Sequence, residues 1–151
     1  MKNTVNGWIK SLDHHAILQQ IFNSTELQEM IIDLNTRDQL FEKGEDSLGR
    51  RLDSIGGGYA PYTVKIKIET GRPTDRVTLY QDGDFYKSFR VIVPVGADYI
   101  EITADPMKGS KDINQEWGGF TIGLQQENIE KVQNYIREKY PQVLRTKLDL
   151  A

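Results

Sequence analysis

The sequence predicts an α+β fold with helices near the N-terminus, a small antiparallel sheet that includes a hairpin, and a C-terminal helix packed on the sheet. Three observations lead to this class. Apolar residues recur at helical spacing over residues 4–43 and again after residue 128. Between these regions the apolar residues alternate, as they do in strands. With 151 residues, the chain is long enough for one domain with a real core.

The N-terminal part is predicted to hold two helices within residues 4–43. A break is expected at Asn23–Ser24, because neither residue continues the apolar stripe. The second helix is expected to start directly after the break, since Thr25 and Gln28 have the spacing of a capping box. Gly44 is expected to end it, because glycine is the usual residue after a helix C-terminus.

The middle of the chain is predicted to be rich in strands. Residues 44–62 contain several glycines and form a loop, and alternation over residues 64–69 indicates a strand directly after it. A second short strand is expected at residues 77–80, and one helical turn is expected at residues 84–89, after the Asp82-Gly83 turn. Residues 89–95 and 99–104 flank a Gly-Ala-Asp turn and indicate a hairpin.

A polar loop is predicted at residues 105–119, followed by a C-terminal helix that ends near Tyr140–Pro141. Each side of the glycine-rich loop is too small to fold alone, so the chain is predicted to be one domain. Its expected parts are a helical arm at 1–43, the glycine-rich loop at 44–62, a β-rich core with the C-terminal helix at 63–140, and a tail at 141–151.

The composition excludes several classes of protein. The chain has no cysteine, so it can form neither a disulfide nor a thiolate metal site, which fits a reducing compartment. No apolar run approaches the roughly 20 residues that a membrane helix needs. The net charge is -3, from 22 acidic and 19 basic residues, so strong non-specific binding of nucleic acid is not expected.

Catalytic groups are sparse in the sequence. His14 and His15 are adjacent, and neighbours on a helix point about 100° apart, so they cannot grip one ion together. Asp46-Ser47 lies in a sequence that echoes a hydrolase motif, but that motif's glycine and its partner histidine are missing. A local turn or cap is the favoured interpretation. We predict no catalytic residue, no cofactor and no metal site.

Three further patterns bear on binding. Asp82-Gly83-Asp84 lacks the spacing of a calcium loop and is interpreted as a turn followed by a helix cap. The glycine run 56–58 lacks the lysine of a phosphate loop. A basic cluster with tyrosines nearby is interpreted as a solvated strand face, with nucleic-acid binding as the alternative. It contains Lys65, Lys67, Arg72 and Arg76, with Tyr59, Tyr62 and Tyr80.

The segment from Thr74 to Phe89, with the hairpin after it, resembles head–tail connector and tail-completion proteins of tailed bacteriophages. In that family a leucine precedes a Thr-Gly-hydrophobic-x-x-Ser block and two strands follow. Leu79, Gly83, Phe85 and Ser88 match the pattern, whereas Asp82 stands in place of the threonine. The resemblance covers roughly residues 45–140 and leaves the N-terminal helices without a counterpart.

The resemblance implies a non-enzymatic subunit of a homo-oligomeric ring that joins the head and its portal to the tail. DNA would pass through the ring's channel without sequence-specific binding, and the chain would be found in the virion after assembly in the host cytoplasm. The family also implies that residues 62–70 are helical, whereas their alternation indicates a strand, and the strand is our prediction. Trp8, Pro94 and Trp117 are the expected intersubunit contacts.

Two other functions remain open from the sequence alone. One is a small intracellular protein-binding or regulatory module, which would form a stable dimer. The other is a small hydrolase. A native mass measurement separates these functions from a connector, because a connector is expected to form a ring of high order.

Overall fold

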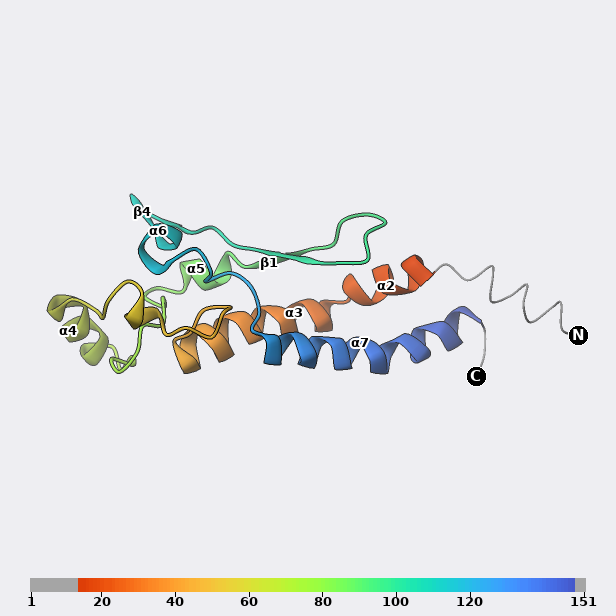
Figure 1. Ribbon diagram of the computed structural model, residues 1–151, viewed down its shortest axis with the longest axis horizontal. Helices are drawn as coiled ribbons and strands as arrows, with labels where there is room; N and C mark the ends of the chain where they lie inside the picture. The colour runs from red at the N-terminus through yellow and green to blue at the C-terminus, as the bar shows by residue number, and fades with distance from the viewer. Residues whose placement is uncertain (1–13, 149–151) are drawn as a thin grey trace, which may run out of the picture.

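In the computed structural model the described residues are 14–148, and their fold is α+β, as the sequence predicted. Figure 1 shows an elongated molecule in which a rod of helices lies beneath a long hairpin. Helix α4 lies at one end of the molecule, and α2 and the end of α7 lie at the other. No helix within residues 14–148 is long and apolar enough to cross a membrane.

The N-terminal helices are α2 (His14–Phe22), α3 (Thr25–Asp33) and the π-helix η1 (Leu34–Lys43), which continues α3. The predicted break at Asn23–Ser24 is confirmed. The cap differs from the prediction, because the Ser24 hydroxyl, not Thr25, accepts from the Leu27 N–H. Gly44 ends η1 in the left-handed conformation, with φ 65°, as predicted.

The C-terminal helix α7 (Gln126–Lys147) runs antiparallel to α3 and η1 (Figure 1). The prediction that it ends near Pro141 is wrong. The apolar stripe continues past the proline, because Val143 and Leu144 pack against the same cluster as Val132. A proline inside a helix removes one backbone donor and crowds the carbonyl four residues earlier, and this packing outweighs that cost. The main contacts of α7 are with α2 and α3 rather than with the sheet.

Residues 61–69 form the helix α4 (Pro61–Glu69), so the strand predicted there is wrong and the helix implied by the phage family is present. Pro61 occupies the first turn, where its fixed φ favours a helix and its missing N–H costs nothing. The alternating apolar residues do not share a buried face, since Ile68 is exposed and Lys67 is buried. A short 3₁₀ helix η2 (Leu52–Ser54) precedes α4 within the glycine-rich loop.

The predicted hairpin is present as β1 (Arg90–Ile92) and β2 (Glu101–Thr103), which are antiparallel with Val91 opposite Ile102. A single helical turn, α5 (Asp84–Lys87), precedes it, as predicted. The strand predicted at residues 77–80 is absent from the described structure. Leu79 has a φ of 56°, which is incompatible with a strand.

The segment predicted to be a structureless loop at 105–119 is ordered. It contains a second small hairpin, β3 (Met107–Lys108) and β4 (Lys111–Asp112), followed by the short helix α6 (Ile113–Trp117). The Asp112 side chain caps α6 by accepting from the Asn114 N–H. Ile113 and Trp117 are buried, so these two apolar side chains anchor the segment to the core.

The core has two parts along the length of the molecule. One lies around α5 and α6, with Phe89 and Trp117 among its members. The other lies between α2, α3 and α7, and the inner face of the hairpin covers it with Val91 and Ile102. Because Ile102 contacts both parts, the two clusters form one continuous core.

Candidate functional site

The phage-like motif folds into a tight turn at the start of α5. Gly83 has a φ of 86° and is the residue before α5, as the predicted turn requires. The Asp82 carboxylate accepts from the Asp84 N–H at 3.1 Å, and this bond holds the pKa of Asp82 below its usual range. The turn predicted at Asp82-Gly83-Asp84 is therefore confirmed, but the residue at the cap of α5 is Gly83, and no side-chain cap bond forms there.

The other motif residues join this turn to the hairpin. Phe85 is buried in the core. The Ser88 hydroxyl donates to the Phe85 carbonyl at 2.6 Å and accepts from the Asp105 N–H at 2.9 Å. Ser88 therefore ties α5 to the chain just beyond β2. Through these two bonds Ser88 has a structural role, because it fixes the chain at the end of β2 to α5.

The backbone before the turn is held by tyrosine side chains instead of a neighbouring strand. The Thr78 N–H donates to the Tyr59 hydroxyl at 2.8 Å, and the Tyr86 hydroxyl donates to the Thr78 carbonyl. Burial raises the pKa of Tyr86 above its usual value, so this donor keeps its proton. Because the Thr78 N–H and carbonyl both have hydrogen-bond partners, this buried segment does not need a neighbouring strand.

We expect Gly83→Val to lower the free energy of unfolding by about 2 kcal/mol, because a β-branched residue is strained at positive φ. An added Cβ would also lie 3.2 Å from the Tyr80 ring. Thermal unfolding followed by circular dichroism measures the loss. Gly58→Val is the matched control, since Gly58 does not have a positive φ and nothing lies within 4 Å of the added Cβ. A Gly83→Val protein that melts with the wild type contradicts the turn.

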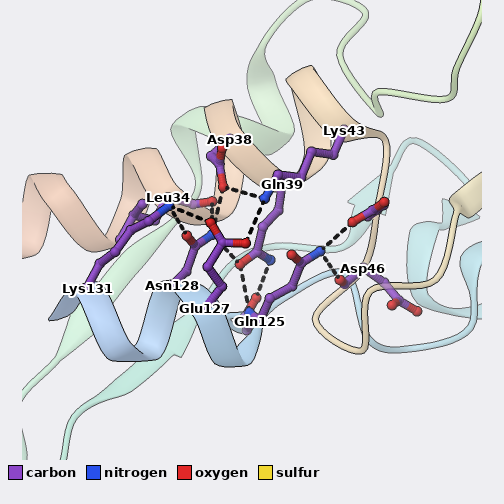
Figure 2. Close-up of polar contacts among 11 residues, drawn as sticks. Leu34, Asp38, Gln39, Lys43, Asp46, Gln125, Glu127, Asn128 and Lys131 are labelled. Atoms are coloured by element: carbon purple, nitrogen blue, oxygen red, sulfur yellow. Dashed lines mark hydrogen bonds and ion pairs between the residues drawn. The ribbon is translucent and has the colours of Figure 1, made fainter. Parts of the chain in front are cut away.

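A buried polar network joins η1 to the start of α7, as Figure 2 shows. Gln39 is at its centre: its amide oxygen accepts from the Gln125 N–H at 2.8 Å and from Asn128 Nδ2 at 3.0 Å. Its amide nitrogen donates to the Gly123 carbonyl at 2.9 Å. Asn35 binds the same loop. Its amide nitrogen donates to the Thr121 carbonyl, and its amide oxygen accepts from the Gly123 N–H.

Charged residues close the network at its edge. Asn128 Nδ2 also donates to the Asp38 carboxylate at 2.9 Å, and Lys43 pairs with Asp38 at 3.2 Å. Burial alone would raise the pKa of Asp38, but the bonds from Asn128 and Lys43 outweigh it and lower the pKa. Within the described residues, every buried side-chain nitrogen and oxygen has a partner. We conclude that the network fixes the loop before α7 in place.

This network was not predicted from the sequence. Its buried members are Asn35, Gln39, Gln125 and Asn128. The one available signal is that Asn35 and Gln39 are four residues apart on the helix that also carries Ile31. Amides at that spacing share a face, but nothing in the sequence shows that the face meets the loop before α7.

The residues weighed as catalytic or metal sites are separated in the structure. His14 and His15 are exposed, and the His14 ring lies against Tyr140 and contacts its hydroxyl. Asp46 accepts from the Leu48 and Arg50 N–H groups at 2.9 Å, which confirms its role in a local turn. Within residues 14–148 no three His, Cys, Asp or Glu side chains form a group that could hold a metal ion.

The expected intersubunit contacts have different outcomes. Trp117 is buried in the core of its own chain, so it presents no exposed side chain to a neighbouring copy. Pro94 lies just beyond β1, and its carbonyl accepts from Gln19 of α2 at 2.9 Å. Trp8 lies outside the described residues.

Within the described residues, the β1–β2 hairpin has strand edges that no third strand covers. Each strand pairs only with the other, so both outer edges are without a strand partner. Ile92, Val95 and Tyr99 are exposed apolar residues on the hairpin and its tip, and Val95 is fully exposed. This set of edges and side chains, the hairpin surface, is the candidate site of assembly.

Comparisons with known proteins add no relative. The chain matches no protein-family model, no curated protein and no solved structure.

Proposed function

We propose that the protein is a structural subunit of the neck of a tailed bacteriophage. In this proposal copies of the chain form a ring that joins the portal of the head to the tail, and DNA passes through the ring's channel without being read. The chain contributes no catalytic group and no cofactor. It acts in the virion after assembly in the host cytoplasm, through contacts with its own copies and with neighbouring portal or tail proteins.

One observation carries the proposal. The phage family implies a helix at residues 62–70, although alternation in the sequence indicates a strand, and the structure has α4 at this place. Thus the resemblance made a structural prediction that local sequence reasoning opposed, and that prediction agrees with the structure. The matched turn at Gly83, the helical turn α5 and the two strands follow α4 in the family's order.

The hairpin surface is the part of the proposed subunit that meets a neighbouring copy. Open strand edges add further strands readily, so a free subunit that presents them is expected to be covered in an assembly. A closed ring needs two different complementary surfaces on each copy. The hairpin supplies one of them, at one side of an elongated body (Figure 1).

Native mass spectrometry and electron microscopy test the proposal, with the chain alone and with the portal protein of the same phage. We expect a closed ring in at least one of these conditions. Val95→Lys should abolish the ring without changing the melting temperature, because Val95 is fully exposed and its lysine would have to be desolvated in the interface. Leu48→Lys, another exposed apolar site away from the hairpin, is the matched control and should leave the ring intact.

A stable dimer in both conditions would contradict the proposal and favour the small regulatory module. A monomer in both conditions would also contradict the proposal, because no ring would have formed. A ring that forms equally well with Val95→Lys would support the neck function but contradict the hairpin surface as the contact.

A further inference from the structure

A cavity of about 400 Å³ lies between α4, the segment after it and the β3–β4 hairpin with α6. We propose that it binds an acidic peptide segment of a partner protein, with a carboxylate side chain next to an apolar one. The inference rests on the cavity alone and holds whether or not the chain forms a ring. Cavities of this size are typical of specific ligand sites.

The cavity is strongly basic in an acidic protein. Four cations line it, against one carboxylate, that of Glu116. The cations are Lys67, Arg72, Lys108 and Lys111. Lys108 pairs with Asp82 at 3.4 Å, but among the described residues none of the other three cations forms an ion pair. The whole chain has a net charge of -3, so this positive lining is local and would attract an anionic group.

Lys67 is the most informative of the four cations. Only 3% of the residue is exposed, yet its ammonium has only the Tyr80 carbonyl, at 3.1 Å, as a hydrogen-bond acceptor. The ammonium also lies 4.3 Å from the centre of the Tyr59 ring. An ammonium has three donors, and a buried charge normally has a counter-ion. The wall of the cavity therefore has a cation that lacks an anion.

The aromatic residues of the cavity argue for a carboxylate and against a nucleotide. Lys67 lies over the Tyr59 ring, and the Arg72 guanidinium lies 5.4 Å from the centre of the Tyr80 ring. A base needs a free aromatic face on which to stack; a cation lies over each of these two rings, which leaves Tyr62 at the rim as the exposed ring. The same cation–π contacts hold the charges at the wall.

The remaining lining suits an apolar side chain. Ile66, Leu79, Ile113 and Trp117 contribute apolar surface to the cavity. Tyr62 lines the cavity and is 74% exposed, as befits a residue at its rim. Peptide recognition commonly combines a pocket for one side chain with charges that fix the neighbouring residue. A peptide with Asp or Glu beside a large apolar residue satisfies both parts.

Selection from a random twelve-residue peptide library on the purified full-length protein tests the proposal. We expect the enriched peptides to place Asp or Glu beside a large apolar residue. The affinity of one synthesised peptide is then measured by fluorescence anisotropy. It should fall at least about tenfold in Arg72→Glu/Lys111→Glu, because two attractive charges become repulsive. The control Lys65→Glu/Lys87→Glu has the same net charge but changes exposed residues outside the cavity, and should bind like the wild type.

Amide NMR spectra of the wild-type protein locate the peptide without any substitution. Shifts confined to the residues that line the cavity support the proposal, even if the double variant fails to fold. The proposal is overturned if no acidic consensus is enriched, if both double variants bind equally, or if the shifts lie elsewhere. Displacement of the peptide by a ten-residue oligo-dT at equal concentration would instead assign the cavity to nucleic acid.

Discussion

Replacing Gly56 with alanine is expected to lower the free energy of unfolding by about 2–3 kcal/mol, which is the cost of overpacking a close contact. An added Cβ would lie 2.4 Å from a ring carbon of Trp117 and 2.6 Å from the Glu116 carbonyl oxygen. Neither can give way easily, because Trp117 is buried and the carbonyl belongs to the backbone. The melting temperature should fall by about 8 °C.

Gly58→Ala is the matched control within the same run of three glycines. Nothing lies within 4 Å of a Cβ added at Gly58, so the change in stability should stay within about 0.5 kcal/mol. Thermal unfolding of the two variants by circular dichroism makes the comparison. If the Gly56→Ala and Gly58→Ala proteins melt together, Trp117 does not pack on Gly56, and its burial in its own chain is in doubt.

Replacing Gln39 with methionine is expected to cost about 3 kcal/mol, because methionine has a similar shape but cannot form the network's bonds. The Gln125 N–H and the Gly123 carbonyl would lose their Gln39 partners, and each buried group left unpaired costs about 1–3 kcal/mol. Asn128 keeps its bond to Asp38, which limits the damage there.

Gln133→Met is the control, since Gln133 is exposed on the same helix α7 that Gln39 helps to hold. Urea unfolding should give a lower midpoint for Gln39→Met alone. Hydrogen exchange adds a test of location, because the amides around Gln125 should exchange faster when their acceptor is gone. A Gln39→Met protein with wild-type stability would mean that the network contributes little to the fold.

The elements that the sequence predicted well are those fixed by neighbours along the chain. The turn at Gly83, the helical turn α5 and the hairpin after it depend on turn chemistry within a few residues. The break before Thr25 and the stop at Gly44 depend on caps of the same short range. Local rules are sufficient for all of these features.

The elements that the sequence predicted wrongly are those decided by distant contacts. Alternation at residues 64–69 indicates a strand, but no partner strand lies beside it, and Pro61 starts a helix there. Pro141 ends a helix in most contexts, but here Leu144 is held by the cluster that Ile17 and Ile21 build. Sequence patterns do not state which distant segment covers a given face, so local rules fail in such places.

The candidate sites also differ in whether neighbours along the chain or distant contacts form them. The motif residues from Leu79 to Ser88 could be found from the sequence because they are close together along the chain. The basic cavity could be predicted only in part. Lys67 and Arg72 stood out near three tyrosines, but Lys108 and Lys111 come from a separate hairpin that the sequence analysis took for a loop.

The antiparallel packing of α7 on the N-terminal helices also constrains how the chain folds during synthesis. The ribosome releases α2 and α3 long before α7, yet Val132 of α7 is part of the cluster that buries Ile17 and Leu27. Until residues 126–147 emerge, α7 does not cover those side chains, and they are exposed to chaperones and to other nascent chains. Completion of the core is therefore delayed until α7 has left the ribosome, and contacts so distant in sequence are expected to make folding slow for a largely helical chain.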